Sequence, residues 1–410
     1  MRFSVLLPTR NRLDLLRYAV ETVRRQDWDD WEIVVSDNAS EQDVAGYVSS
    51  LGEPRITYVR TERPLPVTDN WNNAVAHSRG DYLIMLGDDD CLLKGCLRRA
   101  SDLVDRYRTP DCIYANALLY AYPGVMPGLP NGFLRPYDFA PFFRGAPPDF
   151  KLEPSQRHDL ARAALNFEMR YTFNMQHFIV SRRFVESLGA AGPFYQSPYP
   201  DFYAANVALL KARSLVVSAV PMVAVGISPK SFGYYYFNEQ EKKGVEFLDN
   251  LPDEETARRL SHVILPGLAD KTSWLIAVER IRANYGLELG LRVNYGRYRR
   301  LQVLHVFSRH SLARRCRDPR LAGCIEEFEA LRARLRPWER ALYLGPLRLA
   351  AAIGRFLPGR IRERVVRSFL LWMGKTPQLD LRETEPRHAN ILEVFERVDP
   401  QSSALPGTTG

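Results

Sequence analysis

Residues Tyr82-Leu83-Ile84-Met85-Leu86-Gly87-Asp88-Asp89-Asp90 join a short apolar run to three consecutive carboxylates. The apolar run is typical of a strand that is buried on both faces. Open α/β sheets hold ligands beyond the carboxyl ends of their strands, and oxygen donors placed there suit Mg²⁺ or Mn²⁺. Since neighbouring carboxylates repel each other, this stretch indicates either a metal site or a solvated acidic turn before the next helix.

The sequence on either side of this stretch alternates strand and helix signals. Apolar runs and helical periodicity follow one another at residues 3–7, 13–23, 31–35, 44–51, 56–59, 68–78, 82–86, 93–107 and 112–120. This order predicts an α/β fold with a doubly wound sheet, largely parallel in its first part and mixed as a whole. From about residue 241 helical periodicity dominates. We expect a ligand-binding domain over residues 1–240, a mainly helical C-terminal region over 241–375 and a loose tail over 376–410.

Two more polar loops follow predicted strands. Residues Pro8, Thr9 and Arg10 end the first strand, and Asp37 lies in the turn-rich loop after the second. Each loop by itself is most simply a helix cap or a turn. Together with the three aspartates they would meet at one edge of the sheet, and this arrangement favours a nucleotide site.

These motifs resemble family 2 glycosyltransferases of the GT-A fold, as found in bacterial surface-polysaccharide synthesis. The resemblance rests on Ser4–Arg12, Glu32–Ser40, Asn70–Ala74 and Gly80–Asp90 and covers about the first 240 residues. It implies an enzyme that binds a nucleoside-diphosphate sugar through Mn²⁺ or Mg²⁺ and transfers the sugar with inversion.

The resemblance also implies roles for individual residues. Thr9 and Asp37 would contact the base and ribose, with Pro8 and Arg10 shaping that pocket. Asp88 would lie against the ribose or the sugar. Asp90 would ligate the metal, with Asp89 as the alternative ligand.

An inverting transfer also needs a base that takes the proton of the acceptor hydroxyl. The family places an acid about 100 residues after the aspartates, at a helix start, and Asp201 is the only acidic residue between Glu186 and Glu239. The simpler interpretation is a carboxylate at a helix N-terminus, and both can hold. Lys230, in a loop with two hydroxyls and flanking glycines, is a candidate partner for the diphosphate.

The positive charge of the chain is concentrated late in the sequence. Residues 332–375 hold eleven Lys and Arg against two acidic residues, a local charge of +9 in a chain whose total is +8. Residues 361–373 have amphipathic helical spacing with arginines on the opposite side. Cations next to apolar residues favour an anionic membrane surface over nucleic acid, although a helical bundle or a homo-oligomer contact would explain them too.

The dispersed cysteines and the lack of a signal peptide or spanning segment fit an enzyme in the cytoplasm, peripheral on the inner face of the plasma membrane. The expected partners are a nucleotide-sugar donor, a lipid-linked or glycan acceptor and that membrane, but no nucleic acid. Two alternatives stay open: a nucleotidyltransferase of related fold, and a non-catalytic protein that docks on membranes or polyanions.

Overall fold

The structure is a computed structural model of the chain. It describes residues 2–137, 140–143, 145–238, 240–249, 254–267, 269–314, 323–353, 382–384 and 387–401. The chain divides into two compact units. The sheet unit comprises Met1–Ala161, Arg170–Asn250 and Leu381–Gly410, and the helical unit comprises Arg162–Met169 and Leu251–Asp380. The change from sheet to helices therefore comes near the predicted residue 240, while the predicted three-part division stays a prediction.

The sheet unit is built on one 10-stranded sheet with the main order β3-β2-β1-β4-β9-β6-β10-β5. Its strands are β1 (Phe3–Thr9), β2 (Trp31–Asp37), β3 (Ile56–Arg60), β4 (Tyr82–Met85), β5 (Cys91–Leu92), β6 (Cys112–Ala121), β7 (Phe133–Pro136), β8 (Asp149–Lys151), β9 (Phe178–Ser181) and β10 (Leu215–Ile227). The first four strands run parallel, so their carboxyl ends share one edge of the sheet.

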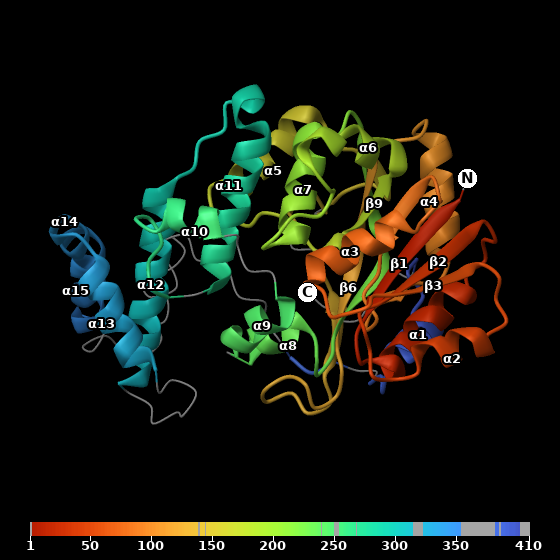
Figure 1. The fold of residues 1–410 in the computed structure, drawn as a ribbon, viewed down its shortest axis with the longest axis horizontal. Helices are drawn as coiled ribbons and strands as arrows, with labels where there is room; N and C mark the ends of the chain where they lie inside the picture. Colours follow the sequence, from red (N-terminus) through yellow and green to blue (C-terminus); the bar gives the residue numbers. More distant parts are fainter. Residues whose placement is uncertain are drawn as a thin grey trace. The chain divides into compact units, whose positions relative to one another are not determined.

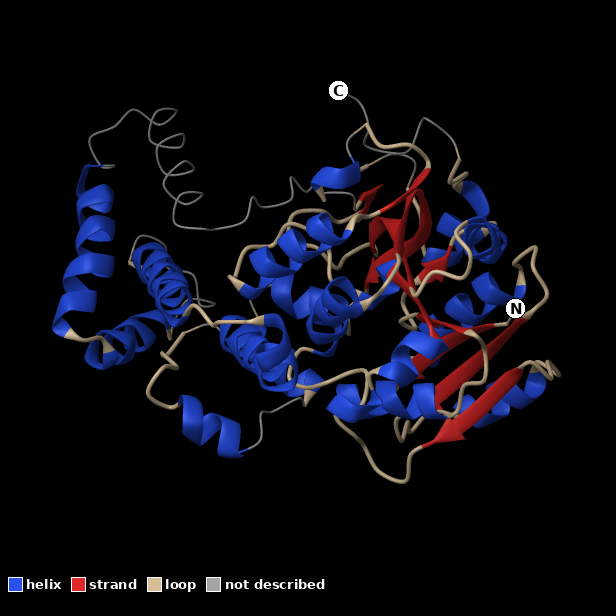
Figure 2. Ribbon diagram, turned by 90° about the horizontal axis from the view of Figure 1, so that it is seen from above, coloured by secondary structure: helices blue, strands red, loops and turns tan. Residues whose placement is uncertain are grey.

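Helices cover this sheet because β1, β2 and β4 are apolar along almost their whole length and must be buried on both faces. Helix α3 lies across β1 and β2 (Figure 1). Figure 2 shows helices on both sides of the strands. The helices outside the helical unit are α1 (Leu13–Arg24), α2 (Val44–Ser50), α3 (Val67–Ala76), α4 (Cys96–Arg106), α6 (Arg182–Ser187), α7 (Pro200–Lys211), α8 (Phe232–Phe237), α9 (Glu241–Leu248) and α17 (Ile391–Arg397), while α5 (Pro154–Leu165) reaches the boundary.

The sheet is mixed, as the sequence predicted for the chain as a whole. Strand β9 lies antiparallel between β4 and β6, and β5, β7 and β8 are also antiparallel to their partners. Residues 123–148 are rich in proline and glycine, yet they contain β7, which pairs with β6. The predicted fold class, α/β with a doubly wound mixed sheet and a mainly helical C-terminal region, is confirmed.

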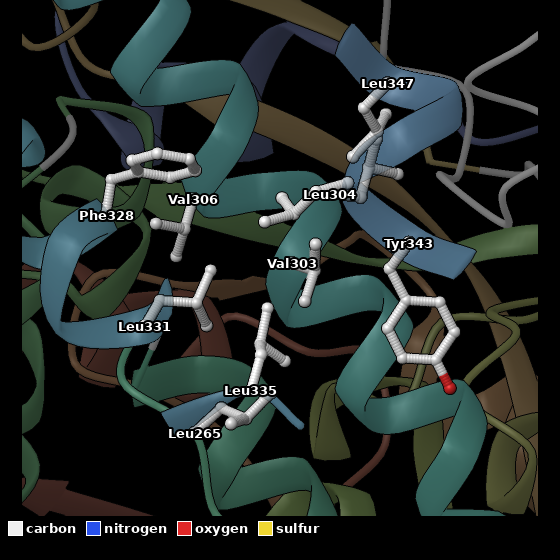
Figure 3. Packing of buried hydrophobic residues seen from close by; sticks show 10 residues of the cluster. Leu265, Val303, Leu304, Val306, Phe328, Leu331, Leu335, Tyr343 and Leu347 are labelled. Carbon is white, nitrogen blue, oxygen red and sulfur yellow. The ribbon is translucent and has the colours of Figure 1, made fainter. Parts of the chain in front are cut away.

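The helical unit has its own apolar core. This core contains Leu265 and buried residues of three helical stretches, Tyr295–Ala313, Cys324–Arg334 and the segment 340–353. Figure 3 shows the side chains. This unit contains α10 (Glu254–Leu260), α11 (Ala269–Leu289), α12 (Tyr295–Ala313), α13 (Cys324–Arg334), α14 (Pro337–Glu339), the π-helical turn η5 (Arg340–Leu344) and α15 (Gly345–Ile353). Within the part of the chain that the structure describes, no helix is both long and apolar enough to cross a bilayer.

The chain returns to the sheet unit near its end. Helix α17 buries Ile391, Val394 and Phe395 and packs on α1 and β5. Its Glu396 carbonyl accepts a hydrogen bond from Lys94 Nζ at 2.6 Å. These residues differ from the loose tail that the sequence suggested. The amphipathic stretch predicted over residues 361–373 lies outside the described residues.

Candidate functional site

The first two polar loops meet at the carboxyl ends of β1 and β2. Thr9 and Asp37 are direct partners in the parallel register, and the Asn38 amide donates to the Thr9 carbonyl at 2.9 Å. Asn11 has a φ of 55°, so the chain turns sharply between β1 and α1. Its side chain accepts a hydrogen bond from the Glu41 amide at 2.7 Å, and this bond joins the two loops.

The third loop, Asp88-Asp89-Asp90, lies next to them, and each carboxylate has different partners. Asp88 Oδ2 accepts from Thr9 Oγ1 at 2.7 Å. Asp89 Oδ2 accepts from Ser228 Oγ at 2.6 Å, in the loop after β10. The sequence-predicted convergence of Thr9, Asp37 and the three aspartates is therefore present.

Asp90 is held by the backbone on both sides. Its Oδ1 accepts from the Gly226 amide at 2.7 Å and its Oδ2 from the Gly87 amide at 2.8 Å, and Gln176 adds a side-chain hydrogen bond. A Cβ at Gly87 would come within 2.5 Å of Asp90 Oδ2, so an acidic residue does not fit at position 87 in this turn. Asp90 thus ties the triplet to β10 and η2 (Met175–His177).

One buried cation faces the three carboxylates. Arg12 Nη2 lies 2.9 Å from Asp88 Oδ1, and Arg12 Nη1 lies 3.8 Å from Asp89 Oδ2. Burial alone would lower the pKa of Arg12, but the three aspartates reverse this effect and raise it. Burial raises the pKa of Asp88 and of Asp90, and the charge of Asp89 raises both further. The site therefore has more negative charge than Arg12 neutralises, and a further cation would relieve it.

Asp37 is fully buried and saturated with hydrogen bonds. Its Oδ2 accepts from Tyr58 at 2.7 Å and from Arg60 at 3.0 Å, and its Oδ1 accepts from the Ser40 amide at 2.9 Å. The Arg60 side chain is 48% exposed. Asp37 thereby fixes its own loop and holds a half-exposed guanidinium at the same edge of the sheet.

The other predicted ligand-binding residues border this edge. Pro8 is half-buried within β1, and Lys230 Nζ donates to the Asn11 carbonyl at 3.0 Å. Arg10, predicted to shape the base and ribose pocket, is exposed, and Arg12, two residues later, contacts Asp88 and Asp89.

Asp201 occupies the first turn of α7, directly after Pro200 at the first helical position. One carboxylate oxygen accepts from the Phe202 amide at 2.8 Å. Burial raises the pKa of Asp201 to about 7, against an ordinary value of 3.8. The carboxyl group is close enough to Tyr137, Tyr171 and Tyr195 to act on them electrostatically. A carboxylate in this setting can take up a proton near neutral pH.

Two connections join the surroundings of Asp201 to the aspartate triplet. Gln176, which binds Asp90, belongs to η2, and η2 packs on α7. The Tyr199 ring also contacts Phe232 of α8, at 6.4 Å between centroids, just after the Lys230 loop. Asp201 and the aspartate triplet are therefore connected through η2, α7 and α8.

Sequence reasoning missed four residues that complete the site: Arg12, Arg60, Gln176 and Ser228. Arg12 lay inside the quoted opening motif, and Ser228 inside the loop of Lys230, so both had a positional signal. Arg60 ends β3 at the edge where β1 and β2 also end. Gln176 had no such signal, because its contact depends on where β9 inserts into the sheet.

Comparison with known proteins agrees with this geometry. Residues 4–122 match the model of glycosyl transferase family 2. This segment spans β1 to β6, including Thr9, Asp37 and the aspartate triplet. The segment that carries the candidate site is thus similar to glycosyl transferase family 2, as its motifs indicated.

The curated relatives carry related names. A Campylobacter jejuni protein named GalNAc(5)-diNAcBac-PP-undecaprenol beta-1,3-glucosyltransferase is 36% identical over 99 residues, which are 23% of this chain and 32% of that protein. An Escherichia coli K12 protein named as a colanic acid biosynthesis glycosyl transferase, WcaA, is 28% identical over 148 residues, 34% of this chain and 52% of that protein. The chain thus spans about half or less of the length of these relatives.

Among solved structures, the chain is similar to Staphylococcus aureus TarS 1–349. The TM-score is 0.44 at 14% identity, over 84% of this chain and 92% of that one. This likeness is too weak to support a conclusion about activity.

Proposed function

We propose that this chain is an inverting glycosyltransferase that moves a sugar from a nucleoside-diphosphate sugar to a hydroxyl group of a lipid-linked or polysaccharide acceptor. The observation that carries the proposal is the meeting of Thr9, Asp37 and the aspartate triplet at adjoining strand ends, within the segment that matches the family 2 model. The names of the relatives support the reaction class, and the undecaprenol in one name supports a lipid-linked acceptor.

In this proposal the nucleoside binds over the ends of β1, β2 and β3. Asp37 holds the loop, because its oxygens already accept three hydrogen bonds. Arg60 is the half-exposed donor of that cluster and is suited to a ribose hydroxyl or a phosphate oxygen. Thr9 and Pro8 form the floor, and Lys230 offers a positive charge to the diphosphate.

The excess of buried carboxylate over cation fits a divalent metal, Mn²⁺ or Mg²⁺. Asp90 is a poor ligand, since two backbone amides and Gln176 use its oxygens. Asp88 is paired with Arg12 and Thr9. Asp89 also has partners, Ser228 and Arg12, but both contact its Oδ2. We therefore assign the metal to Asp89, through Oδ1, instead of Asp90. When bound, the metal would offset the negative charge of the departing diphosphate.

Asp201 acts as the base. The acceptor hydroxyl loses its proton to the Asp201 carboxylate while its oxygen forms a bond to the anomeric carbon. The bond from that carbon to the diphosphate oxygen breaks, and the nucleoside diphosphate leaves with the electron pair. A pKa of about 7 suits this step, because the carboxylate is available near neutral pH and still holds a proton strongly.

A lipid-linked acceptor would be met at the inner surface of the cytoplasmic membrane. The arginine-rich region after residue 332 supports binding to that surface.

A thermal-shift screen tests the class of enzyme and the donor together. UDP, GDP, dTDP and CMP sugars are each added with and without Mn²⁺. A specific ligand at about 100 times its Kd stabilises the folded protein by about 2.7 kcal/mol. We expect one nucleotide to raise the melting temperature, and to do so more strongly with Mn²⁺. No response to any nucleotide would favour the non-catalytic alternative, and formation of a nucleotide sugar from a nucleoside triphosphate and a sugar phosphate would favour a nucleotidyltransferase.

The metal assignment is tested with two variants. Asp89→Asn should abolish the Mn²⁺-dependent part of nucleotide binding and leave the fold intact. Asp90→Asn should mainly lower stability, because one of the two amides that bind Asp90 would face a donor, at a cost of about 1–3 kcal/mol. The exposed Asp105→Asn serves as the control. The assignment is wrong if Asp89→Asn keeps the full response to Mn²⁺.

A further inference from the structure

The helical segment Pro337–Ile353, formed by α14, η5 and α15, has one buried face. Tyr343, Leu344 and Leu347 belong to the core of the helical unit. Figure 3 shows Tyr343 and Leu347 there. Glu339, on the same side, is 2% exposed and binds Arg299 at 2.5 and 2.8 Å. The segment is therefore anchored firmly, and its opposite face is fixed in place.

The opposite face is apolar where a helix surface is normally polar. Trp338 is 53% exposed, Leu342 60% and Leu349 63%. Ala341, Gly345 and Pro346 between them are also exposed and carry no polar side chain. We call the exposed side of this segment the outer face. Large apolar side chains grouped on one exposed element mark an interaction surface.

The exposed charged residues from position 330 to 353 are all arginines, and one of them, Arg332, is paired with Glu329 at 3.3 Å. Arg332, Arg334, Arg336, Arg340 and Arg348 are exposed. Glu339 is the only acidic residue between positions 330 and 353, and it is buried against Arg299. The surface is thus complementary to an anionic partner that also accepts apolar side chains.

We propose that the outer face of Pro337–Ile353 docks on a bilayer that contains anionic phospholipid. A bilayer offers both requirements at one boundary, phosphate groups for the arginines and acyl chains for Leu342 and Leu349. Trp338 suits the boundary itself, since an indole ring is apolar with one hydrogen-bond donor. Arginine stems can lie along apolar surface while the guanidinium reaches the phosphates. The proposal concerns a surface outside the candidate active site and does not depend on the transfer reaction.

Vesicle co-sedimentation of the full chain without nucleotide tests this surface. The vesicles contain phosphatidylcholine alone or with roughly one third phosphatidylglycerol, in about 0.1 M and about 0.5 M NaCl. We expect binding to the phosphatidylglycerol vesicles that weakens at the higher salt concentration. Arg336→Gln and Arg348→Gln should each weaken binding about fivefold. The double variant Trp338→Ser, Leu342→Ser should weaken it by at least about tenfold.

The matched control is Leu287→Ser, because Leu287 is fully exposed on another helix, α11. It should bind like the unchanged protein. As a second measurement, tryptophan emission should shift to shorter wavelength with the anionic vesicles, and Trp338→Phe should lose most of this shift although five other tryptophans remain.

Three results would overturn the proposal. The first is equal binding to both kinds of vesicle. The second is a loss of binding in Leu287→Ser as large as in the double variant. The third is a dimer in light scattering that the double variant dissociates, which would make the outer face a contact between two copies of the chain.

Discussion

Replacing Asp201 with asparagine should stabilise the protein while it abolishes transfer. The folded pKa of Asp201 is about 7, against an ordinary 3.8, because the carboxyl group is buried. Between these values the folded state keeps a proton that the unfolded state has released. The free energy of unfolding therefore falls as the pH rises from about 4 to about 7. Above pH 7 the full cost of burying the charged Asp201 carboxylate is present.

The size of the penalty follows from the shift. About three pKa units at about 1.4 kcal/mol each give an upper limit of about 4 kcal/mol. Asparagine has no charge to bury, and its side-chain oxygen can still accept from the Phe202 amide. At about 2–4 °C per kcal/mol, this limit means that Asp201→Asn should raise the melting temperature at pH 8.5 by at most about 8–16 °C. The gain should shrink toward zero near pH 4.

The assay is thermal unfolding of both proteins from pH 4 to pH 8.5 in steps of about half a unit. Asp88 and Asp90 titrate in both proteins, so their contributions cancel in the difference. Asp105→Asn, on the exposed side of α4, controls for loss of one negative charge. A gain that does not vary with pH, or a loss of stability at pH 8.5, would refute the burial argument. In parallel, transfer should fall by at least about 100-fold with nucleotide binding nearly unchanged, and retained turnover would remove Asp201 as the base.

Three further changes test other parts of the structure. Arg12→Met should destabilise the protein by about 3 kcal/mol, since it leaves Asp88 without its cation. Mn²⁺ should raise the melting temperature of this variant more than that of the unchanged protein. An equal rise in both proteins would contradict the argument that the site has an excess of negative charge. Phe395→Ala should lower the free energy of unfolding, measured by urea denaturation, by about 3 kcal/mol, because Phe395 of α17 is part of the core. Glu396→Gln affects only an exposed ion pair and should change this free energy by less than about 1 kcal/mol. Equal urea midpoints for the two variants would mean that the C-terminal residues are loose, as the sequence suggested. Gly226→Ala should abolish nucleotide binding in the thermal-shift screen, as its Cβ would come within 2.0 Å of the Asp89 carbonyl oxygen, and normal binding would show that the triplet can shift.

The sequence was informative where local pattern and structure coincide. The apolar runs at β1, β2 and β4 end in turn-forming polar residues, so the strand ends and the residues beyond them could be predicted. Because parallel strands place these ends at one edge, Thr9, Asp37 and the aspartates could be brought together without coordinates. Asp201 was located in another way, by the spacing that the family resemblance implies and because it is the only acidic residue between Glu186 and Glu239.

What escaped prediction depends on contacts between distant residues. The contact of Arg12 with the aspartates depends on the turn at Asn11, whose positive φ no residue pattern in the loop demanded. The use of Asp90 by two backbone amides depends on β10 passing beside the triplet, over a hundred residues later in the chain. Helix α17 could have been predicted from local sequence, because Ile391, Val394, Phe395 and Val398 follow helical spacing. It was missed because the composition of residues 376–410 as a whole suggested a loose tail.

The order in which the sheet unit is assembled has a consequence for synthesis on the ribosome. Its helix α17 covers α1 and β5 but begins about 380 residues after the start of α1. A nascent chain that has completed β10 therefore still exposes the apolar patch that α17 will cover. Folding of the N-terminal half can therefore be finished only after α17 has been synthesised, and a stop codon before Ile391 would leave a protein with every predicted active-site residue and an uncovered core.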